Sequence, residues 1–448
     1  MRDLNTGFFV KDDFPRQPVP LVDRRGWILI ALVWIGYGTD LVGASLGVYL
    51  ASGMAVKDAL ISIWVANLIM GIIGGLLSYI GGSTGLSTAM ISRFVFGEIG
   101  SRILSIALFI MLLGFFGIEA GLFGDSAQYI LQAVFGVEFS GHWLAVIGAL
   151  LMTLTATFGY FVIERLSSVA VPLMLFLLSG LIGKIAAHSS DQWLFIGPES
   201  GMVITMGSAI SLVVGSWIGI CVVSPDIARW AKSKKAAFLS GFFGLLIGNS
   251  MMMSAAVIMA RITGSDDVIQ VMIGVGWGAW AAVILILAQW TTNDNLLYSG
   301  GLSMSNIFRS VPKFMLTLGI GLFGTLLTYL KFVDSLVQFV GILAVVFAPV
   351  AAIYLVEFFL LNRTRFLFAF IQNKQVAPIY WTSMFSWIAA AIVGLVTMPT
   401  VEGGFELFTI TGAPGLDAFL VAALLHFLVG KSVQKLSKKQ TEEGVANA

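Results

Sequence analysis

A dense run of polar side chains interrupts an otherwise apolar stretch of the sequence near residue 290. It consists of Gln289-Trp290-Thr291-Thr292-Asn293-Asp294-Asn295. Polar side chains are costly inside a bilayer unless they bind something. The adjacent hydroxyls of Thr291 and Thr292, with carbonyls freed by an unwound helix, would supply oxygen ligands for a hard monovalent cation. The alternative is that the threonines bond to their own helix and the Asn-Asp-Asn run lines a helix contact. The residues alone leave both interpretations open.

Glycines interrupt two other apolar stretches. The first contains Gly36-Tyr37-Gly38-Thr39-Asp40, and the second contains Gly215-Ser216-Trp217-Ile218-Gly219. Glycine costs about 1 kcal/mol in a helix interior and allows the backbone to unwind. Interrupted helices at matching positions of two halves indicate the binding site of a transporter built from inverted repeats. Alternatively, the glycines only allow helices to pack closely.

Two acidic residues, Asp40 and Glu119, fall inside apolar segments. A charged side chain at the centre of a spanning helix costs about 2.5–3.5 kcal/mol on insertion scales, so we expect both to have a function. Asp40 follows Gly36 by four residues, and its carboxylate is expected to point toward a substrate. Alternatively, Asp40 caps the second half of a broken helix. Glu119 could instead pair with a hydroxyl or with Lys184.

The elements that must position these residues are membrane-spanning helices. The chain has 448 residues, of which 58% are hydrophobic and only 11% charged, and its mean hydropathy is +0.94. Soluble domains have roughly a quarter charged residues, and a spanning helix needs about 20 apolar ones. The sequence therefore predicts an all-α polytopic membrane protein with about twelve spans, at residues 27–50, 58–82, 101–132, 142–162, 168–188, 205–227, 236–261, 270–298, 314–332, 335–360, 380–399 and 415–430.

Other classes fit the composition poorly. A net charge of +1 and a single cysteine argue against nucleic-acid-binding and disulfide-rich secreted proteins. An enzyme would need a nucleophile, a metal set or an acid–base constellation, and the sequence has no such pattern. A channel would need charge rings or a repeated filter. The positions of Lys and Arg place both termini in the cytoplasm. The predicted parts are a tail at 1–26, a first repeat at 27–188, a second at 205–360, two further spans at 380–430 and a tail at 431–448.

The chain resembles the nucleobase:cation symporter family, also called the purine–cytosine permeases. The resemblance rests on Trp290-Thr291-Thr292-Asn293-Asp294-Asn295-Leu296-Leu297-Tyr298, on Gly81-Gly82-Ser83-Thr84-Gly85-Leu86-Ser87 and on Val214-Gly215-Ser216. It implies a LeuT-type fold with two inverted five-helix repeats plus two C-terminal helices, in a bacterial cytoplasmic (inner) membrane. It also implies a sodium-coupled symporter that imports a small nucleobase-like molecule by alternating access. We expect a monomer surrounded by lipid, with no nucleic-acid partner and no cofactor other than the coupling sodium ion.

The resemblance also implies site residues. Sodium would be held by the carbonyls of Gly36, Thr39 and Ala288 and the hydroxyls of Thr291 and Thr292. Residues expected at the substrate are the stacking pair Phe115 and Trp217, the backbone at Gly215, Ser216 and Gly219, and the side chains of Asp40, Glu119 and Gln289.

The chain departs from the family where Leu112 and Ala288 replace two amides that bind the base. With Asp40 and Glu119 gained, the pocket becomes cation-attracting. The alternatives to a neutral nucleobase with sodium are therefore a cationic amine or guanidine held by Asp40 and Glu119, or coupling to protons.

Overall fold

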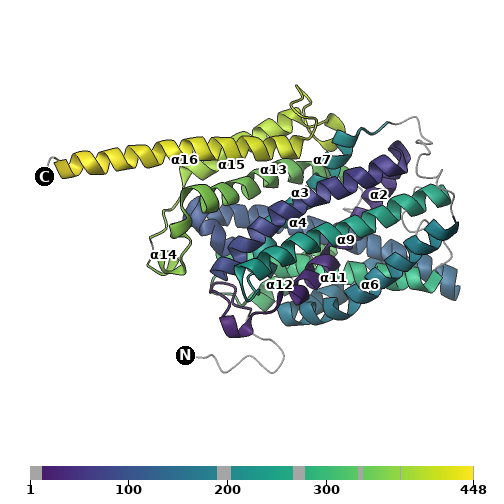
Figure 1. The fold of residues 1–448 in the computed structure, drawn as a ribbon. Helices are drawn as coiled ribbons and strands as arrows, with labels where there is room; N and C mark the ends of the chain where they lie inside the picture. Colours follow the sequence, from purple (N-terminus) through teal and green to yellow (C-terminus); the bar gives the residue numbers. More distant parts are fainter. Residues whose placement is uncertain (1–12, 189–202, 266–277, 331–335, 374, 447–448) are drawn as a thin grey trace, which may run out of the picture.

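The computed structural model describes residues 13–188, 203–265, 278–330, 336–373 and 375–446, and this part of the chain is helical, with one isolated bridge between Arg25 and Ala231. Figure 1 shows long helices running side by side through the body. In the described ranges, α3 packs on α9, α4 on α11 and α13 on α16. The α-helices are α1 (Trp27–Gly38), α2 (Leu41–Gly53), α3 (Val56–Thr84), α4 (Thr88–Phe135), α5 (Gly141–Thr157), α6 (Tyr160–His188), α7 (Met206–Val222), α8 (Ser224–Ala228), α9 (Lys234–Thr263), α11 (Gly278–Ile307), α12 (Lys313–Tyr329), α13 (Leu336–Val356), α14 (Phe368–Gln372), α15 (Trp381–Thr397) and α16 (Pro414–Ala446).

Within the described residues, 6 helices are long and apolar enough to cross a membrane. The bent pair α1–α2 makes a seventh candidate, and α5, α7, α12 and α15 are shorter apolar helices. The all-helical membrane architecture is therefore confirmed. The number of twelve spans and the repeat boundaries stay predictions.

The first span is broken where its sequence suggests. Helices α1 and α2 meet at an angle of 54°. Thr39 and Asp40, between them, have non-helical backbone angles. The Asp40 side chain accepts a hydrogen bond of 2.5 Å from the Gly43 amide. Asp40 is thus the N-cap of α2, which confirms the capping alternative for this residue.

The predicted break at Gly215–Gly219 is wrong. These residues lie inside the continuous helix α7, and the chain leaves helical geometry only at Val223, before α8. Pro225, near the start of α8, lacks the amide that would continue the helix. A Cβ atom on Gly215 would lie 3.1 Å from Ala344 Cβ, and one on Gly219 would lie 2.4 Å from Met111 Sδ. These two glycines allow neighbouring helices to approach closely, which is the alternative interpretation of the glycines in the sequence.

The described parts of both predicted tails have a defined structure. Val19 N donates to Gly85 O (2.9 Å), and Arg24 Nη1 donates to Gly82 O (3.0 Å). The described part of the N-terminal segment therefore packs across the helix ends, because buried charges attach it there. At the other end, α16 continues to Ala446 and extends beyond the body in Figure 1. Its last turns contain Lys, Glu, Gln and Ala, which favour helix.

Candidate functional site

The hydroxyl of Thr291 lies among three carbonyl oxygens. Thr291 Oγ1 is 3.0 Å from Gly36 O on α1, 3.0 Å from Ala288 O and 2.9 Å from Leu287 O on α11. A hydroxyl has a single hydrogen and can satisfy only one of these acceptors at a time. The structure therefore concentrates oxygen atoms at the contact between α1 and α11, and three members of the predicted cation set lie together there.

The other two predicted cation ligands lie beside this contact. Thr292 Oγ1 is 3.2 Å from Tyr37 O, the carbonyl that follows Gly36. Thr39 stands between α1 and α2, and its hydroxyl donates to Ile35 O at 2.8 Å. All the predicted residues thus come from the same two elements, the broken first span and α11.

Close approach of the helices makes this contact possible. A Cβ atom on Gly36 would lie 2.9 Å from Val171 Cγ2 on α6 and 3.4 Å from Thr291 Cβ on α11. A larger residue at this position would separate α1 from both neighbours. Gly36 therefore provides space as well as a carbonyl oxygen.

The remaining polar side chains of α11 largely support the structural alternative. Asn293 Nδ2 contacts Met152 Sδ at 3.0 Å, and the Thr155 hydroxyl donates to Asp294 Oδ1 at 2.7 Å. Both partners lie on α5. Asn295 Nδ2 donates to Thr291 O at 2.8 Å. The run therefore combines a helix contact with a cluster of oxygen atoms, and the two sequence interpretations hold together.

The two buried acids meet at the N-terminus of α2. Asp40 caps the helix through Gly43 N, and Glu119 Oε1 on α4 accepts from Val42 N at 3.4 Å. The partner of Glu119 is thus a backbone amide and not a hydroxyl; the Lys184 side chain lies outside the described part of the chain. Among the described residues, Glu119 Oε2 is buried without a hydrogen-bond partner. The Gln289 amide lies beside the Glu119 carboxyl, near hydrogen-bonding range, but neither of its amide atoms reaches full hydrogen-bond geometry with a described residue.

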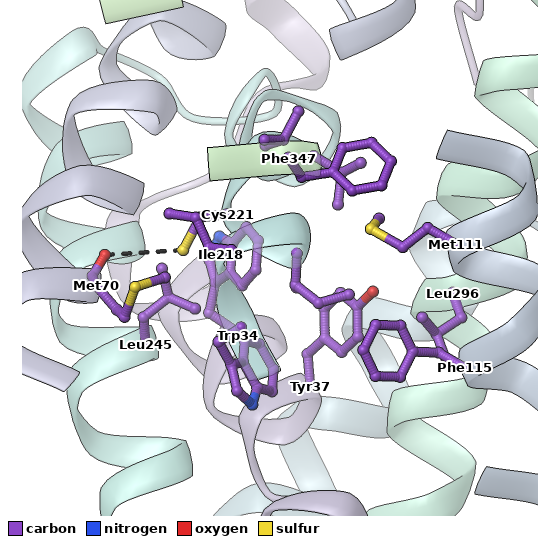
Figure 2. Packing of buried hydrophobic residues seen from close by; sticks show 14 of the residues in the cluster. Trp34, Tyr37, Met70, Met111, Phe115, Ile218, Cys221, Leu245, Leu296 and Phe347 are labelled. Carbon is purple, nitrogen blue, oxygen red and sulfur yellow. Dashed lines mark hydrogen bonds between the residues drawn. The ribbon is translucent and has the colours of Figure 1, made fainter. Parts of the chain in front are cut away.

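Aromatic rings pack beside the break of the first span. Trp217 is 2% exposed, and its ring meets the edge of Tyr37 at 5.5 Å between centroids. Tyr37 also stacks on Trp34 at 5.8 Å. Phe115 packs on Phe339 at 5.3 Å. Figure 2 shows Trp34, Tyr37 and Phe115 in one buried cluster.

The structure adds Tyr37 to the residues expected at the substrate. In the sequence, this residue stands out only as part of the string Gly36-Tyr37-Gly38. Its hydroxyl is buried and has no hydrogen-bond partner among the residues that the structure describes. The same holds for Trp34 Nε1, Glu119 Oε2 and both amide atoms of Gln289. An unsatisfied buried polar group costs about 1–3 kcal/mol, and native structures leave few of them. A polar ligand at the break of the first span would satisfy the Tyr37, Glu119 and Gln289 atoms, which lie near one another, so we take this region as the candidate substrate site.

The helix break, the buried polar atoms beside it and the apolar helices around them define a membrane carrier. A family model described as permease for cytosine/purines, uracil, thiamine, allantoin matches residues 18–421. The chain therefore belongs to this family of permeases. It is a membrane transporter for nucleobase-like substrates and not an enzyme, as the sequence predicts.

Curated relatives cover most of the chain. The cytosine permease of Escherichia coli K12 is 29% identical over 432 residues, which are 93% of this chain and 97% of the relative. The hydantoin permease of Microbacterium maritypicum is 23% identical over 386 residues, covering 78% and 74% of the two chains.

Solved structures show the same fold. Mhp1, a nucleobase-cation-symport-1 family transporter, in a closed conformation with bromovinylhydantoin bound, superposes with a TM-score of 0.78 at 18% identity, covering 94% of this chain and 96% of the other. A Na⁺-coupled sialic acid symporter gives 0.64 at 11% identity, covering 95% and 92%. These similarities confirm the LeuT-type fold.

Proposed function

We propose that this permease is a sodium-coupled symporter, which imports a small nitrogen-rich substrate of the nucleobase class by alternating access. The observation that carries the proposal is the position of Thr291 Oγ1 among the carbonyls of Gly36, Ala288 and Leu287. Such a group of neutral oxygens, at the contact of a broken helix with its neighbour, suits a monovalent cation. We further propose a monomer in the bacterial inner membrane with both termini in the cytoplasm.

Sodium would couple to the substrate through the broken span. An ion held by the carbonyls of Gly36, Thr39 and Ala288 and the two threonine hydroxyls would attach α1 to α11. The same attachment would order Tyr37 and Asp40, which adjoin the candidate substrate site. Coupling between two binding sites is typically worth about 1–3 kcal/mol, or 5–150-fold in affinity.

Replacing both Thr291 and Thr292 with alanine should abolish the stimulation of substrate binding by sodium, because two of the five oxygen ligands are removed. The measurement is binding of radiolabelled cytosine and hydantoin to the purified protein, with sodium or with choline as the cation. The matched control is Thr325→Ala, which removes a buried hydroxyl whose bond among the described residues is to its own helix, at Gly321 O. Sodium stimulation that survives in the double variant would rule out this cation site. Uptake driven by a pH gradient without sodium would instead favour proton coupling.

Trp217→Ala should weaken substrate binding about 5–150-fold, since stacking of a base on an aromatic ring contributes about 1–3 kcal/mol. Trp217 packs beside Tyr37 near the break, and Phe115 is expected on the opposite side of the ligand. Trp217→Phe keeps a ring and should retain most of the affinity. Equal affinities of the alanine variant and the unmodified protein would show that Trp217 only packs.

A further inference from the structure

The two acids at the start of α2 differ in how well their oxygens are satisfied. Asp40 holds the N-cap position of a 13-residue helix, and its carboxylate accepts the Gly43 amide at 2.5 Å. The positive end of the helix dipole stabilises an anion at this position. Glu119 contributes Oε1 to the neighbouring Val42 amide through a longer contact of 3.4 Å. Its second oxygen, Oε2, has no hydrogen-bond partner in the described part of the chain, although the residue is only 1% exposed. Asp40 therefore has a structural role, and Glu119 is available to a ligand.

Charge balance at this position favours a cation. Among the residues that the structure describes, neither Asp40 nor Glu119 belongs to an ion pair; the pairs recorded there involve other acids. A buried carboxylate that stays ionised requires a partner of opposite charge. The oxygens proposed as sodium ligands are all neutral, and neither carboxylate is among them. A positively charged substrate would supply the partner that Glu119 lacks.

The neighbouring polar atoms determine which kind of cation fits. When ionised, Glu119 Oε2 can only accept hydrogen bonds, while the Gln289 amide and the Tyr37 hydroxyl can accept or donate. None of these atoms has a partner of full hydrogen-bond geometry among the described residues. Phe115 precedes Glu119 by four residues on α4, so both occupy one face of that helix. An acceptor-rich group beside aromatic rings matches a flat ligand with several N–H donors.

We propose that Glu119, with Gln289, forms a subsite for a planar cation of the amidinium or guanidinium type within a small ring. This inference rests on the proposed function and defines its substrate class. Asp40 acts as a positioning residue, because its cap holds the start of α2 against Glu119. The subsite therefore recognises the positive charge of its ligand through Glu119 and not through Asp40.

The test compares two ligands of nearly equal shape and different charge. 2-Aminoimidazole is a cyclic guanidinium that is protonated at neutral pH, and 2-imidazolone is its neutral isostere. Competition of each against bound ligand, and the thermal stabilisation that each gives, are measured on the full-length protein with sodium, with cytosine as a third ligand. We expect the cation to bind at least tenfold more tightly than its isostere. Glu119→Gln should weaken the cation at least tenfold and leave the isostere unchanged or tighter.

The control separates the two acids. Asparagine is as good an N-cap as aspartate, so Asp40→Asn should keep the preference for the cation. Loss of the preference in this variant as well would overturn the division of roles. If the unmodified protein binds 2-imidazolone or cytosine as tightly as 2-aminoimidazolium, with sodium stimulation intact, the inference is wrong and the proposed function stands. If no ligand of the nucleobase class binds in a sodium-dependent way, the proposed function and the inference both fail.

Discussion

Replacing Lys313 with alanine should lower the free energy of unfolding by about 3–5 kcal/mol, the effect of leaving one member of a buried ion pair without its partner. Lys313 Nζ lies 2.7 Å from Asp13 Oδ2, and the two side chains are 6% and 7% exposed. The same ammonium lies 3.9 Å from the centroid of the Tyr298 ring. Without it, the Asp13 carboxylate would keep, among the described residues, the Tyr160 amide at 3.1 Å as its donor. Denaturant unfolding of the detergent-purified protein measures the change.

The double variant Asp13→Asn/Lys313→Met removes both charges together and should be less destabilised than Lys313→Ala. Measured together with the single variants Asp13→Asn and Lys313→Met, the double variant gives the interaction energy of the pair. Lys435→Ala is the matched control, because Lys435 is exposed and its loss should change stability by less than about 0.5 kcal/mol. Equal effects of Lys313→Ala and Lys435→Ala would show that the N-terminal segment is not anchored by this pair.

Gly97→Ala should destabilise the protein by roughly 3 kcal/mol or more, since two unfavourable effects add at one position. Gly97 lies at the kink inside α4 with φ 87° and ψ −178°, a conformation that only glycine adopts readily. A Cβ atom there would lie 2.7 Å from the carbonyl oxygens of both Ala377 and Pro378. Those carbonyls accept the amides of the next two residues, so the backbone cannot move away without losing hydrogen bonds. The yield of monodisperse protein and its melting temperature measure the effect.

Gly136 provides the comparison for this substitution. It also has a positive φ, 64°, at the end of α4, but a Cβ atom there would meet nothing within 4 Å. Gly136→Ala should therefore show only the cost of the left-handed conformation, about 1–2 kcal/mol. Losses of equal size at the two positions would mean that the contact with Ala377 and Pro378 contributes nothing.

Local features of the sequence determined the class of protein and the position of its first break. Apolar length alone indicates spanning helices, because a bilayer acts on each segment separately. Gly36, Gly38 and Asp40 together predict an interrupted helix, since glycine weakens a helix and aspartate caps the one that follows. The Thr291–Thr292 pair points to one side of the proposed cation site, because hydroxyls inside a bilayer need partners.

Only the tertiary structure decided the features that depend on contacts between distant residues. Asp13 and Lys313 are 300 positions apart, and a polar N-terminal segment alone gives no sign of the pair. The glycines of α7 permit a break, but the helix is continuous there, and these glycines instead leave room for Ala344 and Met111 on neighbouring helices. In the sequence, Asp40 and Glu119 look alike, because each is an acid inside an apolar segment. The position of α2 satisfies the first and leaves an oxygen of the second free, because the partners of a side chain depend on which helices pack beside it.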